Sequence, residues 1–353
     1  MDSSEGIERL LRVEKIELVY GRAIIVVVRD VESSFGQSLQ DYVRDQIASS
    51  MGWIMPDIKV SYSILLEQFS CQLKINGQIV AQTRILPHLS LAINHTPLEG
   101  IVECLDAGDI FEGYCCAWID SRMVYKVIKQ KGKILSSADA FVKWLLYTIS
   151  GNIQDLFGFE ELQTLIDFGN RLYPATLNAA VKTVGMPAML KVFRNLLEDG
   201  VSVKPLESIF TSIAIHGYAD CDSDHLTEQV RLSLCNSICL PLAYDAGCIY
   251  VISIHPELEA WLIKQDYTND IAGQSFAGEL ASSILAAVDE VTDSGFLPVI
   301  LTNTGLRSRL SSLLRKNHRR IHVLASSEIP RAATVETLYT IKPLKQKESI
   351  YDR

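Results

Sequence analysis

The sequence has no long hydrophobic run and little positive charge. Its strongest apolar run, residues 23–28, stops at Arg29 and Asp30 and falls far short of the roughly 20 residues that span a bilayer. Lysine and arginine number 33 against 42 aspartate and glutamate, a net charge of −9. Nucleic acid and anionic lipid are therefore disfavoured as main partners, because binding to either requires a positive excess. The first five residues do not follow the pattern of a signal peptide.

Cysteine pairs and catalytic motifs are also missing. The eight cysteines include no C-x-x-C pair and no regular spacing, which predicts reduced thiols, a cytosolic setting and no structural zinc. Residues 273–278 imitate a nucleophile elbow, but the second glycine stands one place too far along and no strand precedes it. His318 and His322 are four residues apart, where the pattern indicates the end of a helix. We therefore expect no catalytic residue, no metal ligand and no cofactor.

The first third of the chain mixes strand and helix signals. Residues 13–28 contain two strand candidates around Gly21, and apolar residues at helical spacing follow in 39–51, ahead of Pro56. Residues 59–65 then alternate as a strand does. Asn76-Gly77 separates two further alternating runs and predicts a hairpin, because this pair accepts the positive φ angles of a type I′ turn. The order β-α-β-β-β predicts a small sheet with a helix on one face.

The remainder changes from helical to alternating signals. Ser136 or Ser137 can cap a helix, and helical patterns continue to about Tyr218. Within 187–213 the apolar stripe stops at Gly200 and restarts after Pro205, which predicts two helices packed across a tight turn. Strands predicted at 249–254, 297–301 and 320–324 alternate with helices from 256, over 272–291 and over 304–316, as in an α/β domain.

These patterns together predict a mixed α/β multidomain fold. It consists of small α+β, ferredoxin-like N-terminal subdomains, an all-helical middle subdomain and an α/β C-terminal subdomain. The expected boundaries are a split first subdomain (8–31 and 98–133), an inserted α+β subdomain (32–97), a helical subdomain (134–221), a C-terminal subdomain (222–345) and a polar tail (346–353).

Several segments resemble one known family in their residues as well as in their apolar pattern. Residues 187–210 resemble the signature VLxNLLxEGVxIRDLxxILExLA of the FHIPEP proteins, the export gates of flagella and type III secretion systems, in their cytoplasmic region. Further segments match in the same order, at 109–119, 155–167, 224–231, 252–262 and 297–310. Two departures favour the injectisome, or virulence, branch. Phe111 stands one place early in an acidic-Pro-x-Phe-Gly motif that lacks its proline here, and Lys143-Trp144 replaces an expected Thr-His pair.

The resemblance implies a non-enzymatic function in protein transport. The chain is expected to be the cytoplasmic part of a larger, multi-span inner-membrane protein. It would form a homo-oligomeric, nonameric ring that docks chaperone-cargo complexes and helps to select them for export. Its other partners would be gatekeeper, stalk and ATPase-complex proteins, with no nucleic acid among them.

Two groups of site residues follow from the resemblance. The family's chaperone-docking cleft carries over to Asp109, Phe111, Glu112, Gly113 and Lys143. Family members form their ring through the helical block, where the candidate complementary contacts are the exposed charges of Lys191 and Arg194 against Glu198 and Glu207. A plainer interpretation stays open for both groups. Phe111 and Trp118 are then core aromatics and Asp109 caps a turn, while the charged residues form a solvated helix face.

The alternative from another functional class is a helix-turn-helix transcriptional regulator with an α/β sensing domain. The two helices predicted within 187–213 have a suitable shape for reading DNA. Their charges argue against it, because the basic and acidic residues of 186–214 balance to zero and a phosphate-binding surface needs a positive excess.

Overall fold

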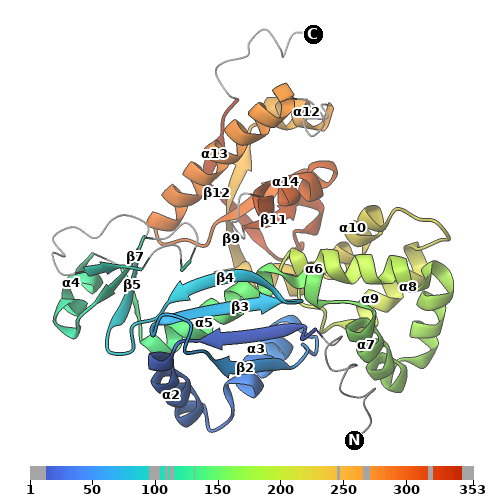
Figure 1. Cartoon of the computed structure of the whole chain (residues 1–353). Helices are drawn as coiled ribbons and strands as arrows, with labels where there is room; N and C mark the ends of the chain where they lie inside the picture. The colour runs from blue at the N-terminus through green and yellow to red at the C-terminus, as the bar shows by residue number, and fades with distance from the viewer. Residues whose placement is uncertain are drawn as a thin grey trace, which may run out of the picture. The chain divides into compact units, whose positions relative to one another are not determined.

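The computed structural model describes residues 13–94, 104–107, 110–111, 115–130, 132–244, 247–264, 271–316 and 321–343 (Figure 1). The chain divides into two compact units, Met1–Phe168 and Gly169–Arg353. None of the described helices combines the length and the apolar character needed to cross a bilayer. The mixed α/β architecture that the sequence predicts is confirmed.

The first unit begins with a four-stranded sheet of order β2-β1-β3-β4. Its strands are β1 (Ile16–Tyr20), β2 (Ile58–Tyr62), β3 (Ser70–Ile75) and β4 (Gln78–Arg84). β1 pairs in parallel with β2 and antiparallel with β3. The predicted hairpin joins β3 to β4, with φ of 49° at Asn76 and 79° at Gly77. Positive φ at both positions gives the type I′ geometry expected of this dipeptide.

Helices α2 (Ile25–Phe35), α3 (Leu39–Met51) and α5 (Ser137–Gly151) belong to the same part of the unit (Figure 1). The second strand predicted within 13–28 is wrong, because residues 22–24 form a 3-10 turn and Ile25 opens α2. Val27, Val28 and Val31 fall on one buried face of that helix, which packs against α5. This packing overrides the strand preference of a β-branched run. α3 ends as Gly52 takes a left-handed φ of 84°, before Pro56 is reached.

A second sheet, of order β6-β7-β5-β8, is antiparallel throughout. It contains β5 (Ser90–Asn94), β6 (Cys104–Asp106), β7 (Cys115–Ile119) and β8 (Lys133–Leu135). The short helix α4 (Val124–Lys129) lies between β7 and β8 in the chain. Val127 of α4 packs against Ala92 and Ile119. In the first sheet, β1 of segment 8–31 pairs with strands of segment 32–97. The predicted subdomain boundaries stay predictions.

Short α6 (Ile153–Leu156) precedes the helices α7 (Phe159–Leu172), α8 (Pro174–Glu198), α9 (Leu206–His216), α10 (Ser223–Ser233) and α11 (Cys235–Cys239). α8 is two helices joined at Gly185, whose φ of 73° and ψ of 169° break the helical path just before Pro187. The predicted helix from Pro187 is the second of these two. Gly200 adopts the expected left-handed φ of 73°, and α9 packs back on α8 as the sequence predicts.

The chain then forms a parallel sheet of order β11-β10-β9-β12. Its strands are β9 (Cys248–Ile254), β10 (Val299–Thr302), β11 (His322–Ala325) and β12 (Thr334–Ile341), and its helices are α12 (Pro256–Lys264), α13 (Ile271–Asp293) and α14 (Thr304–Lys316). α13 runs alongside β12 (Figure 1). The sequence pattern predicts no strand at β12, whose first four residues are all exposed. Only its second half, at Leu338 and Ile341, reaches the core, so the strand has too little apolar alternation to detect.

Candidate functional site

The predicted docking residues fall only partly within the described chain. Asp109, Glu112 and Gly113 lie outside it. Phe111 is half-buried, and its ring meets the ring of Tyr147 edge-on at 84°, with centroids 6.1 Å apart. Lys143 is exposed and stands four residues before Tyr147 on α5, so both side chains project from the same side of that helix. The structure thus brings Phe111 and Lys143 to one face of α5.

α5 is a well-anchored support for this face. Ser136 caps its first turn, where the Ser136 hydroxyl accepts a hydrogen bond from the Asp139 amide at 3.0 Å. Phe141 and Trp144 of the same helix are buried in the core. Trp118 is also buried, with 1% of its surface exposed, and is a core aromatic. Phe111 differs from these residues because it keeps part of its ring accessible.

The predicted ring-interface residues separate into exposed and buried members. Lys191 on α8 is 53% exposed and lies 3.2 Å from Asp224 of α10, whereas Glu207 is exposed on α9. Arg194 is half-buried. The expectation that Glu198 is exposed is wrong, because its side chain is only 12% exposed and lies 3.5 Å from Arg315 of α14. Glu198 sits in the last turn of α8, where the helix meets α14, so it faces inward.

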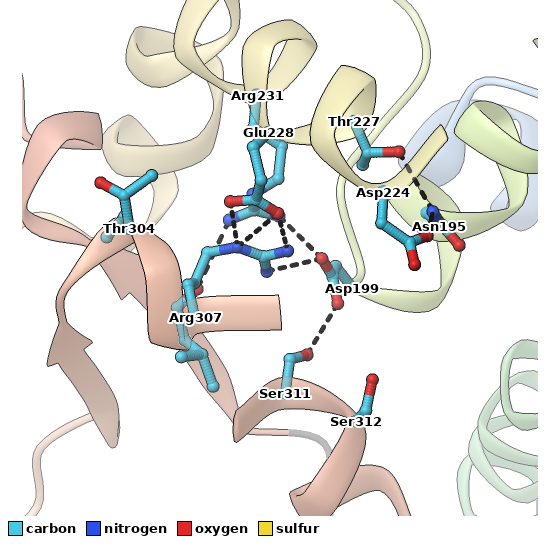
Figure 2. Close-up of polar contacts among 12 residues, drawn as sticks. Asn195, Asp199, Asp224, Thr227, Glu228, Arg231, Thr304, Arg307, Ser311 and Ser312 are labelled. Atoms are coloured by element: carbon cyan, nitrogen blue, oxygen red, sulfur yellow. Dashed lines mark hydrogen bonds and ion pairs between the residues drawn. The ribbon is translucent and has the colours of Figure 1, made fainter. Parts of the chain in front are cut away.

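Beside Glu198 lies an ionic cluster that the sequence analysis did not identify (Figure 2). Asp199, which follows α8 directly, is 6% exposed and accepts four hydrogen bonds. Its Oδ1 accepts from Ser311 and Arg315 at 2.7 Å each, and its Oδ2 from Arg307 at 2.7 Å and Arg231 at 3.2 Å. We call this set, together with Glu228 and Glu328, the Asp199 cluster.

The two other carboxylates of the cluster, Glu328 and Glu228, each bind one of the arginines that contact Asp199. Glu328, 1% exposed, receives Nε of Arg231 at 2.6 Å and its terminal nitrogen at 3.2 Å. Glu328 also accepts a hydrogen bond from the Ala325 amide at 2.7 Å. Glu228 binds Arg307 in the same two-pronged manner, with Nε at 2.8 Å from Oε2. Such paired N–H donors match the planar fork of arginine to a carboxylate.

Each charged group in the cluster affects the pKa of its neighbours. Burial alone would raise the pKa of Asp199, but the guanidinium groups of Arg307, Arg231 and Arg315 outweigh it and hold that pKa below its ordinary value. Burial opposes the charge of Arg307 as well, yet Asp199 and Glu228 raise the pKa of its guanidinium. Asp199 and Arg307 therefore each favour the charged form near neutral pH. The cluster links the helices to the parallel sheet by buried ion pairs and does not form an acid-base pair.

A signal for the cluster does exist in the sequence. Arg307, Ser311 and Arg315 recur every four residues and so form one polar stripe along α14. Asp199, Glu228, Arg231 and Arg307 also lie inside segments that resemble the FHIPEP motifs. What the sequence did not reveal is that these segments meet in space.

Within the described part of the chain, no group of three or more histidine, cysteine, aspartate or glutamate side chains is arranged to hold a metal ion. The segment that imitates a nucleophile elbow, 273–278, is helical and lies within α13, so it lacks the strand-to-helix turn of a true elbow. His255 supports the predicted junction between β9 and α12, where its ring accepts a hydrogen bond from the Glu257 amide at 3.4 Å.

Comparisons with known proteins agree with the fold. A match to the FHIPEP family covers residues 1–334. Flagellar biosynthesis protein FlhA of Bacillus subtilis is 23% identical over 350 residues, which are 96% of this chain and 51% of that protein. The chain thus spans about half the length of this relative.

Two similar solved structures cover nearly the whole chain. The Chlamydia pneumoniae CdsV protein, in its complex with CdsO, has a TM-score of 0.75 at 20% identity over 94% of this chain and 98% of that chain. The nonameric EscV cytosolic domain from the type III secretion system has a TM-score of 0.69 at 15% identity over 93% and 97%. At such identities the likeness shows a common fold.

Proposed function

Because the chain belongs to the FHIPEP family, we propose that it is the cytoplasmic part of a type III secretion export-gate protein, at the inner face of the bacterial inner membrane. In this role it makes and breaks no covalent bond. It forms a ring that receives chaperone-cargo complexes and takes part in selecting them for export. The main support is that its fold corresponds, over 93% of the chain, to a cytosolic domain solved as a nonamer. No observation favours the helix-turn-helix alternative.

Ring assembly is the first element of the proposal. A closed ring of identical subunits requires a head-to-tail interface with two different, complementary faces. Lys191 and Arg194 on α8 and Glu207 on α9 supply opposite charges on neighbouring helices. Exposed ion pairs contribute only about 0–1 kcal/mol each, so these residues set the register of the contact more than its strength. Glu198 is not part of the proposed contact, because it lies against α14.

A charge swap tests this contact directly. Lys191→Glu and Glu207→Lys should each lower the fraction of rings seen by electron microscopy and by sedimentation at rising concentration. The double variant should recover rings, because the opposite charges again face each other. Lys182→Glu, an exposed position on the first part of α8, is the matched control. A wild-type chain that stays monomeric at high concentration, also within the full-length protein, contradicts the ring.

Cargo docking is the second element. We place it on the face of α5 that carries Phe111 and Lys143, where an accessible ring offers apolar area and a lysine offers orientation by charge. By likeness to CdsV, which was solved with CdsO, the chain also has a partner of that kind. Gatekeeper and ATPase-complex proteins complete the set of partners proposed for this domain.

Phe111→Ala tests the docking face. We expect at least a ten-fold loss of affinity for chaperone-cargo complexes of the same bacterium, a typical effect for a buried aromatic anchor. Phe159→Ala removes a ring that is 52% exposed on α7 and should leave binding unchanged. Circular dichroism confirms that both variants fold. Unchanged affinity in a folded Phe111→Ala protein removes this face from the proposal.

A further inference from the structure

Three aromatic rings meet at the amino end of strand β9, away from the residues discussed above. The ring of Tyr250 lies 4.6 Å from Phe296 and 5.3 Å from Tyr244, and Tyr244 lies 5.8 Å from Phe296, measured between centroids. The three planes are tilted by 50–74° to one another. The rings touch, so they leave no space for a ligand between them. Any ligand must bind on their outer surfaces.

The rings are held rigidly and are partly exposed. The Tyr244 hydroxyl accepts a hydrogen bond from the Leu297 amide at 2.8 Å, and the Tyr244 amide donates to the Cys248 carbonyl at 2.8 Å. Phe296 packs against the apolar core beneath the sheet. Tyr244 is nevertheless 40% exposed and Leu297 38%. Rigid aromatic side chains with accessible faces give affinity at a low cost in conformational entropy.

One carboxylate lies beside Tyr250, and two more precede Phe296 at the end of α13. Glu336 of β12 is the register partner of Tyr250 of β9, so the two side chains are neighbours on one side of the sheet. Glu290 and Asp293 are exposed in the last turn of α13, which contains no basic residue. Acidic groups at a helix carboxyl end are unfavourable, since they add to the negative end of the helix dipole.

The negative charge of this region is largely uncompensated. In the described part of the chain, none of these three carboxylates forms an ion pair, and Arg331 lies in the turn before β12. We call Tyr244, Tyr250, Phe296, Leu297, Glu290, Asp293 and Glu336 the aromatic-acidic patch. It combines partly exposed rings with three carboxylates, an excess of negative charge over the one arginine in the adjoining turn.

We propose that the aromatic-acidic patch docks an arginine-bearing segment of a partner protein. A guanidinium group stacks on an aromatic face and pairs with a carboxylate at the same time, whereas an ammonium group acts as a compact point charge. Leu297 and the 78% exposed Leu240 give adjacent apolar area for the same segment. This interaction is independent of ring assembly and of the docking face on α5.

The test measures fluorescence anisotropy with a labelled peptide of alternating leucine and arginine. Two control peptides replace every arginine with lysine or with glutamate. We expect the arginine peptide to bind more tightly than the lysine peptide and at least ten-fold more tightly than the glutamate peptide. The double variant Asp293→Lys with Glu336→Lys should lose about ten-fold in affinity, through two lost pairings and the new repulsion.

Matched variants separate the patch from the general charge of the chain. Glu279→Lys changes an exposed carboxylate on the same helix, about 21 Å along the axis from Asp293, and should leave affinity within two-fold. Tyr244→Ala should weaken binding while Tyr244→Phe retains it, and Tyr125→Ala removes a more exposed tyrosine elsewhere without effect. Equal binding of the arginine and glutamate peptides overturns the proposal. So does a loss with Glu279→Lys as large as that with the double variant.

Discussion

The substitution Asp199→Asn provides the sharpest test of how this protein holds its helices to its parallel sheet. It keeps the size of the side chain and removes its charge from a position where four donors converge. Two of these donors belong to guanidinium groups that are 2–3% exposed. Removing one member of a buried ion pair costs about 3–5 kcal/mol, because the partner charge stays buried.

The same substitution at an exposed site is the control. Asp224 is 56% exposed, pairs with Lys191 and accepts a hydrogen bond from Asn195. Asp224→Asn should therefore cost no more than about 1 kcal/mol. Ser311→Ala, which removes one neutral donor to the Asp199 carboxylate, should cost about 1.5–3 kcal/mol. The order of the three variants follows from burial and charge alone.

Hydrogen exchange read by mass spectrometry is the appropriate assay, since it reports opening free energies segment by segment. Peptides from α10, α14 and β11 should exchange roughly a hundred- to several-thousand-fold faster in Asp199→Asn. Peptides from the first unit should not change. The reasoning is refuted if Asp199→Asn accelerates exchange no more than Asp224→Asn does.

The pH dependence of this difference follows from the depressed pKa of Asp199. In the unfolded chain the carboxyl titrates near its ordinary value of about 3.9. A group whose native pKa lies lower stabilises the fold above that value and loses this contribution as the pH falls through the native pKa. The gap between wild type and Asp199→Asn should thus be constant from about pH 5 to pH 8 and should shrink in stronger acid.

Two further outcomes test other parts of the second unit. Gly169→Ala would place a Cβ atom 2.7 Å from Cε2 of the buried Phe210 and should lower the unfolding free energy by about 1–3 kcal/mol. Gly278→Ala, with open space around it on α13, should instead raise the unfolding free energy by up to about 1 kcal/mol. Equal changes of the thermal midpoint in the two variants would contradict the packing argument. Burial and the neighbouring Arg231 lower the pKa of His322, so the native state resists a proton that the unfolded chain accepts, and stability should fall as the pH drops through about 6.5. His322→Gln should flatten this slope in urea titrations, and an unchanged slope assigns the pH dependence to other groups.

Features encoded by neighbouring residues could be predicted from the sequence. The Asn76-Gly77 turn, the Ser136 cap and the Gly200 helix end follow from side chains that act within a few residues, and the bounds of α14 follow from its apolar period. The family resemblance likewise rests on short sequence motifs. These signals were enough to indicate the fold class and the family.

The tertiary structure decided the features whose partners are remote in the chain. A β-branched run became helix α2 because its buried face meets α5, and Glu198 turned inward because α14 lies against it. The members of the Asp199 cluster are separated by 97 to 116 residues in pairs such as Arg231 with Glu328 and Arg315 with Asp199. From the sequence alone, a charged residue on a helix is expected to face solvent. Only the folded chain shows whether water or another charge surrounds it, because desolvation depends on everything that packs nearby.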